Sequence, residues 1–266
     1  MSKFYNPFQP TLTHHGLKQF NLSMESIGPC EFFRGKVFSF LQIKAEIPTP
    51  YPVMPDGTQA VYISPKGSMI GGAQLSAQDM HLLEPGEYFG IWFYPGALRH
   101  FFDLDLSEIT GQFVEKSYFA CRYFSQLHNE IYEKNSFKER VNICESWLLS
   151  RYLPKPMTNF DAALQLIYQS FGSDRVSWIA DRVGWSCRHL NRHFLRHTGL
   201  TTKSFSQVVR AQHACWELYK NQHNSKMTTQ EMGYFDQSHL IKDFKKHFAS
   251  TPDDFFSRFM SDLYNN

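Results

Sequence analysis

The stretch "GYFDQSHLIKDFKKHF", Gly233 to Phe248, decides the fold of the C-terminal part of the chain. Its large apolar side chains recur at helical spacing, at Leu240, Phe244 and Phe248, and predict one buried face. The opposite face is polar and charged, and Asp236 stands where a helix N-cap is expected. The stretch therefore predicts a helix that follows a glycine turn. Its polar face is either an ordinary solvated surface or a surface that reads a charged, patterned partner.

An upstream stretch repeats this plan. A short helix is expected to end at Gly184, which tolerates the positive φ of a tight turn, and Ser186 is expected to cap the next helix. A short helix, a tight glycine turn and a second helix form the helix-turn-helix motif. Between the two units, Thr202 to Lys220 predicts a helix of about 28 Å. Since neighbouring major grooves on one face of DNA lie roughly 34 Å apart, one chain could place a recognition helix in each.

The segments "GWSCRHLNRHFLRHTGLTTKSF" and "GYFDQSHLIKDFKKHFASTPDDF" resemble the two units of the DNA-binding domain of the AraC/XylS family of bacterial transcription regulators. The resemblance implies that the first turns of both recognition helices enter the major groove. Arginine suits guanine, asparagine and glutamine suit adenine, and lysine suits phosphate. The residues expected to contact DNA are Arg188, His189, Asn191, Arg192 and Arg196 in the first unit and Gln237, Ser238, His239, Lys242, Lys245 and Lys246 in the second.

The second unit departs from the family pattern in one place. Members of the family usually carry an Ile-Ala pair shortly before the second glycine, where this chain has Thr228 and Thr229. Threonine is β-branched and a poorer helix former than alanine. We therefore expect the short helix that supports the second recognition helix to be loosely packed.

The N-terminal part is expected to be β-rich. Short apolar and aromatic runs, punctuated by glycine and proline, fill residues 30–95 and predict a small antiparallel barrel or sandwich. The segments "MPDGTQAVYIS" (Met54 to Ser64) and "YFGIWFYPGALRHFF" (Tyr88 to Phe102) resemble an N-terminal domain found in a subset of these regulators. The resemblance implies that Pro-Asp-Gly opens a strand and that Pro-Gly-Ala follows a strand and begins a helix.

After Gly111 the spacing of apolar residues changes to that of a helix. It predicts a helical hairpin, with apolar faces from Ala120 to Ile131 and from Phe137 to Leu148. Two prolines in "YLPKPM", Tyr152 to Met157, then oppose helix continuation. We therefore expect an α+β chain of two domains. These are residues 1–153, a β-rich barrel or sandwich ending in the hairpin and serving regulation or dimerisation, and residues 154–266, an all-α DNA-binding domain with two helix-turn-helix units joined by a long helix.

Composition and charge narrow the functional classes. The 266-residue chain has a net charge of +2, but Asp174 to Arg258 holds 13 Lys and Arg against 8 Asp and Glu, a net of +5. A positive segment favours a polyanionic partner. No apolar run is long enough for a membrane span, and the N-terminus lacks the pattern of a secretory signal. The scattered cysteines and histidines predict neither a disulfide framework nor a metal site, and no catalytic set is readable.

These features predict a cytoplasmic, sequence-specific transcription regulator, grouped with the activators of the family, that binds double-stranded promoter DNA as a homodimer. We expect no cofactor, no membrane partner and no enzymatic activity. The helix Phe137 to Leu149 is either a dimer surface or core. A small-molecule effector, contact with RNA polymerase and the choice between activation and repression stay open. Two alternatives are a DNA-binding module fused to an enzymatic, DNA-repair-like domain, and a ligand-binding protein with a weakened DNA domain.

Overall fold

The computed structural model describes residues 5–115, 124–220 and 229–260. Its N-terminal part is built on a six-stranded antiparallel sheet with the strand order β1-β2-β7-β4-β5-β8. A two-stranded antiparallel sheet, β3 with β6, accompanies it. The strands are β1 (Leu22–Ile27), β2 (Val37–Ala45), β3 (Thr49–Val53), β4 (Gln59–Ser64), β5 (Gly67–Gly71), β6 (Gln78–Leu83), β7 (Gly86–Phe93) and β8 (Phe113–Glu115). The predicted antiparallel β-rich architecture is confirmed.

The turn at residues 84–86 joins β6 and β7, but these strands do not pair with each other. β7 pairs with β2 on one side and with β4 on the other, whereas β6 pairs with β3. Both edges of β7 are therefore occupied, and the chain crosses from the small sheet into the large one at this turn.

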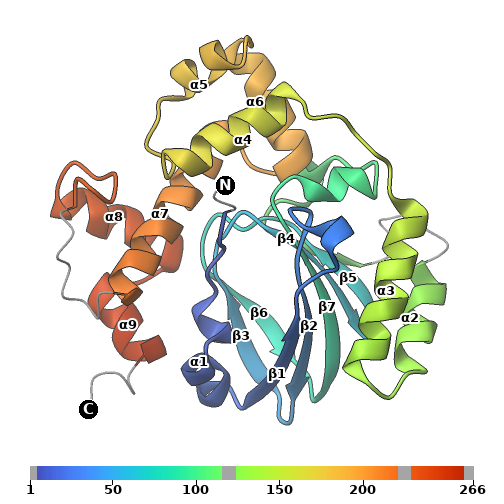
Figure 1. Ribbon diagram of the computed structural model, residues 1–266. Coiled ribbons are helices and arrows are strands. Elements are labelled where there is room, and N and C mark those ends of the chain that lie inside the picture. The colour runs from blue at the N-terminus through green and yellow to red at the C-terminus, as the bar shows by residue number, and fades with distance from the viewer. Residues whose placement is uncertain (1–4, 116–123, 221–228, 261–266) are drawn as a thin grey trace.

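The predicted helical hairpin covers one face of the large sheet (Figure 1). α2 (Phe124–Tyr132) and α3 (Phe137–Arg151) bury Leu127, Cys144 and Leu148 against strand residues in one hydrophobic cluster. Ser136 caps α3 in a capping box, which fixes the start of the helix. Ala120 and Tyr123, which were expected on the first helix, lie outside the described residues.

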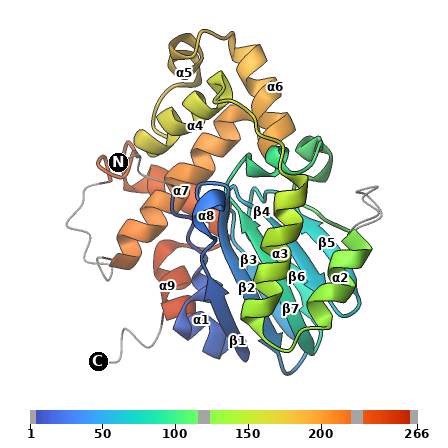
Figure 2. The same ribbon diagram turned by 45° about the vertical axis from the view of Figure 1, so that its right-hand side comes forward.

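The C-terminal part is helical, as predicted. Its helices are α4 (Asn159–Gln169), α5 (Val176–Arg182), α6 (Cys187–Thr198), α7 (Thr202–Lys220), α8 (Gln237–Phe248) and α9 (Pro252–Met260). Shorter elements in the N-terminal part are η1 (Pro10–Leu12), α1 (His14–Gln19), η2 (Glu31–Phe33), η3 (Ala97–His100) and η4 (Leu106–Ile109). α7 runs between the group α4, α5 and α6 and the pair α8 and α9 (Figure 1, Figure 2).

The two parts share hydrophobic cores. One cluster joins residues of α1, β1, β2 and β3 to residues of α7, α8 and α9, and it includes Phe20, Ile43, Leu218 and Phe244. The expected boundary after residue 153 falls in the segment between α3 and α4. Since apolar side chains from both sides fill one core, the two parts pack as a continuous body rather than as units on a free linker.

The Pro-Asp-Gly segment of the N-terminal part contacts α7. Gly57 has a φ of +74°, and a Cβ there would lie 2.9 Å from the ring of Phe205. Gln212 of α7 donates from Nε2 to the carbonyl of Pro55 at 2.8 Å and accepts from the amide of Phe8 at 2.8 Å. This segment therefore docks the long helix onto the sheet.

The Pro-Gly-Ala segment contacts α4. Gly96 has a φ of +76°, and a Cβ there would lie 2.8 Å from the ring of Phe160. Arg99 in η3 forms an ion pair with Asp161 of α4. Burial alone would raise the pKa of Asp161, but hydrogen bonds from Arg99 and Thr158 outweigh it and hold this pKa below its ordinary value. Both motifs of the N-terminal part thus face the helical region.

Candidate nucleic-acid interface

The first helix-turn-helix unit consists of α5, a turn at Gly184 and α6. Gly184 has a φ of +69°, which favours glycine, and Ser186 caps α6 by accepting a hydrogen bond from the amide of His189 at 3.2 Å. Leu190 and Phe194 are fully buried in the cluster with α4, α5 and α7. The sequence-predicted turn, cap and inward face of this unit are confirmed.

The residues expected to contact DNA on α6 differ in their exposure. Arg188, Arg192 and Arg196 are exposed, whereas His189 and Asn191 are half-buried. The side-chain oxygen of Asn191 accepts a hydrogen bond from the amide of Thr202 at 3.1 Å. Asn191 thereby joins α6 to the first turn of α7, so its amide already has a structural role. The three arginines are the exposed part of this set.

A hydrogen-bonded relay positions Arg192. Its guanidinium Nη2 lies 3.0 Å from Nδ1 of His189, and Nε2 of His189 lies 3.1 Å from Nε2 of His193. Arginine can only donate, so Nδ1 of His189 accepts and its Nε2–H donates to His193. The ring of His193 in turn stacks on Trp185 with centroids 4.6 Å apart. Burial, His189, Arg192 and further cationic neighbours lower the pKa of His193, which favours the neutral ring that the relay needs.

The outer face of α6 borders the N-terminal part. A cavity of about 800 Å³ lies between Asp105, Ser107 and the side chains of α6. Arg196 forms an ion pair with Asp103 at 3.0 Å, and Thr110 donates from Oγ1 to the carbonyl of Gly199. The segment that carries η4 therefore places carboxylates beside the first recognition helix.

The second unit presents its recognition helix in the expected way. Gly233 has a φ of +83°, and Asp236 caps α8 by accepting from the amide of His239 at 2.7 Å. Leu240, Phe244 and Phe248 are buried. The six residues expected to contact DNA are all exposed: Gln237, Ser238, His239, Lys242, Lys245 and Lys246.

The segment before Gly233 is a turn in the described residues and not the helix that the sequence predicts. Thr229 to Met232 form hydrogen-bonded turns, in which the amide of Gly233 donates to Gln230 at 2.9 Å and the amide of Tyr234 donates to Thr229 at 2.9 Å. Thr228 lies outside the described residues. The β-branched, polar Thr229 fits the absence of helix at its own position.

Three residues that hold α8 in place were not predicted as site residues. Arg210 of α7 forms an ion pair with Asp243 of α8 at 2.9 Å, and His247 lies 3.6 Å from the other oxygen of Asp243. Burial opposes ionisation of Asp243, but the nearby His247 and the hydrogen-bonded ion pair with Arg210 outweigh it and hold its pKa well below the ordinary value. Arg210 also lies over the ring of Tyr234, 4.9 Å from its centroid. The sequence signal was a charged residue on the apolar face of α8.

The same network ties α8 to the N-terminal part. His247 is fully buried, and its Nδ1 lies 2.8 Å from the carbonyl of Leu75. The amide of Ala77 donates to the carbonyl of His247 at 2.7 Å. The second recognition helix is therefore anchored at its C-terminal end to the segment before β6.

The N-terminal part contains a small cavity near its Pro-Asp-Gly segment. It has a volume of about 40 Å³ and lies beside Tyr51, Asp56 and Trp92. Asp56 is buried and accepts hydrogen bonds from Gln9, from the amide of Thr58 and from the Thr58 hydroxyl. Burial raises the pKa of Asp56, and these hydrogen bonds offset part of that rise. A space of this size holds water rather than an organic ligand.

Among the described residues, no three His, Cys, Asp or Glu side chains gather as metal ligands would. No described helix combines the length and the apolar character that crossing a membrane requires.

Residues 179–258 match a family model described as "Helix-turn-helix domain", and residues 27–115 match one described as "Domain of unknown function (DUF6597)". No curated protein matches the chain. Two crystal structures of ToxT from Vibrio cholerae are among the similar solved structures. One has 9% identity, covers 91% of this chain and 99% of its own, and has a TM-score of 0.41; the other has 14% identity, the same coverage and a TM-score of 0.36. No conclusion about function follows from TM-scores this low. The domain match confirms the resemblance predicted from the sequence.

Proposed function

We propose that this chain, whose C-terminal region carries an AraC-type helix-turn-helix domain, is a sequence-specific transcription regulator that binds double-stranded promoter DNA through α6 and α8. The observation that supports this most is the pair of capped recognition helices with exposed polar faces, Arg188 and Arg192 on one and Gln237 and Lys242 on the other. We place the protein in the bacterial cytoplasm, where its DNA is.

Arginine and lysine on both helices would neutralise phosphates and release counterions, which makes the affinity salt-dependent. Base discrimination falls to Arg188 and Arg192 on α6 and to Gln237, Ser238 and His239 on α8. Asn191 is left out of this set because its amide caps α7. Lys245, Lys246 and Arg196 serve as phosphate contacts. Lys246 already donates to Gln207 at 2.9 Å, and Arg196 is paired with Asp103. On binding, DNA phosphates would replace Gln207 and Asp103 as the partners of these two side chains.

Selection of bound duplexes from a randomised library tests the proposal, followed by fluorescence anisotropy on the selected site. We expect an enriched sequence and an affinity that falls by about 10³-fold or more between 50 and 200 mM salt if six or more phosphates are contacted. A library that returns no preferred site at moderate ionic strength would overturn the proposal.

The N-terminal part acts by fixing the positions of both units. It holds α7 through Pro55, Gly57 and Phe8, and it holds α8 through Leu75 and Ala77. An effector beside Asp56 finds little support, since the cavity there has a volume of about 40 Å³. Contact with RNA polymerase, and activation rather than repression, are tested by in vitro transcription from the selected site with purified polymerase.

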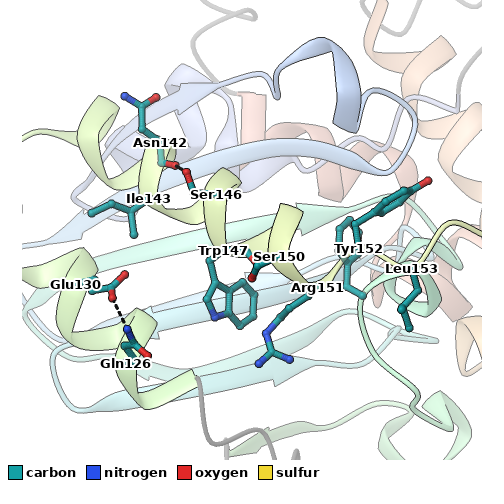
Figure 3. Close-up of a pocket in the computed structure, with 11 residues that line it drawn as sticks. Gln126, Glu130, Asn142, Ile143, Ser146, Trp147, Ser150, Arg151, Tyr152 and Leu153 are labelled. Atoms are coloured by element: carbon teal, nitrogen blue, oxygen red, sulfur yellow. Dashed lines mark hydrogen bonds between the residues drawn. The ribbon is translucent and has the colours of Figure 1, made fainter.

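We also propose that the chain is a homodimer. A cavity of about 840 Å³ lies on the outer side of α2 and α3, where Trp147 and Arg151 lie side by side on α3 (Figure 3). Leu149 and Leu153 are 55% and 54% exposed nearby. The face with Phe137, Val141, Cys144 and Leu148 is core, so only the outer face of α3 is available to a second copy. Light scattering on the wild type and on Leu149→Glu measures the molecular mass in solution and tests this proposal. A monomeric mass for both proteins would contradict it.

The enzymatic alternative has no observation in its favour. A DNA-repair alkyltransferase needs an activated thiolate. Burial and Glu145 raise the pKa of the Cys30 thiol, and burial raises that of Cys144. Both shifts oppose thiolate formation, and Cys121 lies outside the described residues. Thiol titration with and without alkylated DNA separates this alternative from the regulator.

A further inference from the structure

A cavity of about 300 Å³ lies where α7, the end of α4 and the first described residues of the chain meet. Its volume falls at the lower end of the range for small-molecule sites. It is far roomier than the space of about 40 Å³ inside the N-terminal part. The residues that line it and carry the argument are Tyr5, Tyr168, Phe171, His213, Trp216 and Glu217.

Aromatic rings form most of the walls. Tyr5 lies parallel to Tyr168, with ring centroids 4.9 Å apart and an interplanar angle of 4°. Phe171 lies on His213, with centroids 3.8 Å apart and an angle of 11°. Phe171 has a φ of +50° and is 39% exposed. A bulky residue in this backbone conformation is strained, and such strain gathers at binding sites more often than on plain surfaces.

The cavity already holds a cation from its own chain. Nζ of Lys220 lies 5.5 Å from the centroid of the Trp216 ring, within the range of a cation–π interaction. Oε1 of Glu217 lies 3.9 Å from the same Nζ. The faces of aromatic rings are negative and Glu217 adds a carboxylate, so the walls favour positive charge.

Two polar groups at the cavity already have partners within the chain. The amide of Gln212 accepts from Phe8 and donates to Pro55. The hydroxyl of Tyr5 donates to the carbonyl of Asp56 at 2.7 Å. The features that point to a ligand class are therefore the ring faces and the charge of the walls.

We propose that this aromatic pocket binds a small organic cation of the quaternary-ammonium type, whose charged group takes the place of the Lys220 ammonium. The occupant would touch Tyr5, which is fixed to the Pro-Asp-Gly segment, and α7, which joins the two helix-turn-helix units. It would thus connect the N-terminal part to the DNA-binding region. This last consequence rests on the proposed function, whereas the binding site does not.

Calorimetry on the full chain without DNA tests the site. The probes are choline, its neutral isostere 3,3-dimethylbutan-1-ol, and benzoate. We expect choline to bind at least about tenfold more tightly than the isostere, because only choline gains from the ring faces and Glu217. Equal affinity for the isostere, preference for benzoate, or no choline binding at millimolar concentration would each overturn the proposal.

Variants of the pocket sharpen this test. Trp216→Leu should weaken choline binding about tenfold, and Trp216→Phe, which keeps a ring, should fall between it and the wild type. Lys220→Met should tighten binding because the internal cation is removed, and Glu217→Gln should weaken it. Trp178→Leu is the matched control: Trp178 is an exposed tryptophan with Arg182 5.1 Å from its centroid, and its loss should leave choline binding unchanged.

Melting temperatures of all variants show whether each one is folded. If Trp216→Leu and Trp216→Phe melt like the wild type and bind choline equally well, the pocket is not the site. A second arm measures affinity for the selected DNA with and without saturating choline, and we expect a change of at least about threefold. Choline binding without any effect on DNA would overturn the regulatory consequence alone. Choline binding in a chain that binds no DNA would overturn the proposed function and leave the site standing.

Discussion

The two helix-turn-helix units of this chain differ in what holds their recognition helices. α6 packs on a complete first helix, α5, and on α4, and its own polar face carries the relay from Trp185 to Arg192. α8 follows a hydrogen-bonded turn in the described residues and is held by the buried pair Arg210–Asp243 and by the N-terminal part. Both units contact the N-terminal part, the first through Asp103 and Thr110. The first unit also has a helix of its own beneath the recognition helix, whereas the second has a turn in that place and relies on α7 and the N-terminal part.

The largest effect is expected from Asp243→Ala. This change leaves Arg210 and His247 without their shared carboxylate, and loss of one partner of a buried pair costs about 3–5 kcal/mol. Because Arg210 is 14% exposed, we expect a value near the lower end, about 3 kcal/mol. Chemical denaturation measures this loss of unfolding free energy. The control is Asp181→Asn, a change at an exposed carboxylate of α5 that should alter stability by less than about 0.5 kcal/mol.

If Asp243→Ala unfolds no more easily than the control, the second unit does not depend on this pair. If Asp243→Ala is destabilised as expected, hydrogen exchange on the variant shows which helix has lost support. The expected pattern is faster exchange in α8 with little change in α6.

Arg192→Ala is expected to lower affinity for the selected DNA by about 1–3 kcal/mol and to relax preference at one base pair. Lys242→Ala, the corresponding change on α8, should cost less, because α8 has no comparable relay to hold its side chains. Anisotropy on the selected site and on single-base variants measures both. Equal losses on every sequence would make Arg192 a phosphate contact and remove this difference between the units.

Acid should affect the first unit before the second. Burial, Arg99 and His193 lower the pKa of His197 to about 4, and the pKa of His193 is lowered as well. The folded state binds these protons less readily than the unfolded state, so stability is full above pH about 6.5 and declines as pH falls toward 4. The lowered pKa of Asp243 acts in the same direction but at lower pH: its contribution is present above pH about 4 and is lost only below it.

Melting curves between pH 7 and 5 measure this effect. Solvent screening of the half-exposed rings limits it to roughly 1 kcal/mol, or about 2–4 °C. His197→Gln should flatten the decline. A change in Trp185 fluorescence over the same range would report the first unit directly, and a flat profile in the wild type would contradict the assignment.

The smallest effect is expected from Thr229→Ala. Alanine is the better helix former by about 0.5 kcal/mol, and the turn bond from Tyr234 uses only the backbone of residue 229. We expect a gain in stability of at most this amount and slower exchange in α8. A loss of stability would show that the Thr229 side chain itself supports the turn.

Local features of the fold follow from the sequence. The limits of α7 and the buried faces of α6 and α8 agree with the sequence, because the helix period decides which side chains point inward. The caps Ser186 and Asp236 were also predictable, since each satisfies amides within three residues.

The contacts between distant segments were not predictable. Gln212 and Phe8 are 204 residues apart, and nothing in either local pattern indicates their hydrogen bond. The same holds for the pairing of β6 with β3 rather than β7, which depends on the occupied edges of β7. Asn191 has the residue type of a base reader, and its hydrogen bond with the amide of Thr202 is a contact that its own helix pattern does not indicate. The residues proposed to contact DNA stay predictions until the affinity measurements are made.

The 19 residues of α7 contain neither glycine nor proline, so the helix is an unbroken rod without a hinge. At about 28 Å it is shorter than the roughly 34 Å pitch of the duplex. If both recognition helices enter DNA as proposed, the two half-sites of the operator must keep one spacing and one helical phase. Inserting five base pairs between the halves would turn one of them to the opposite side of the duplex, beyond the reach of a rod that cannot stretch.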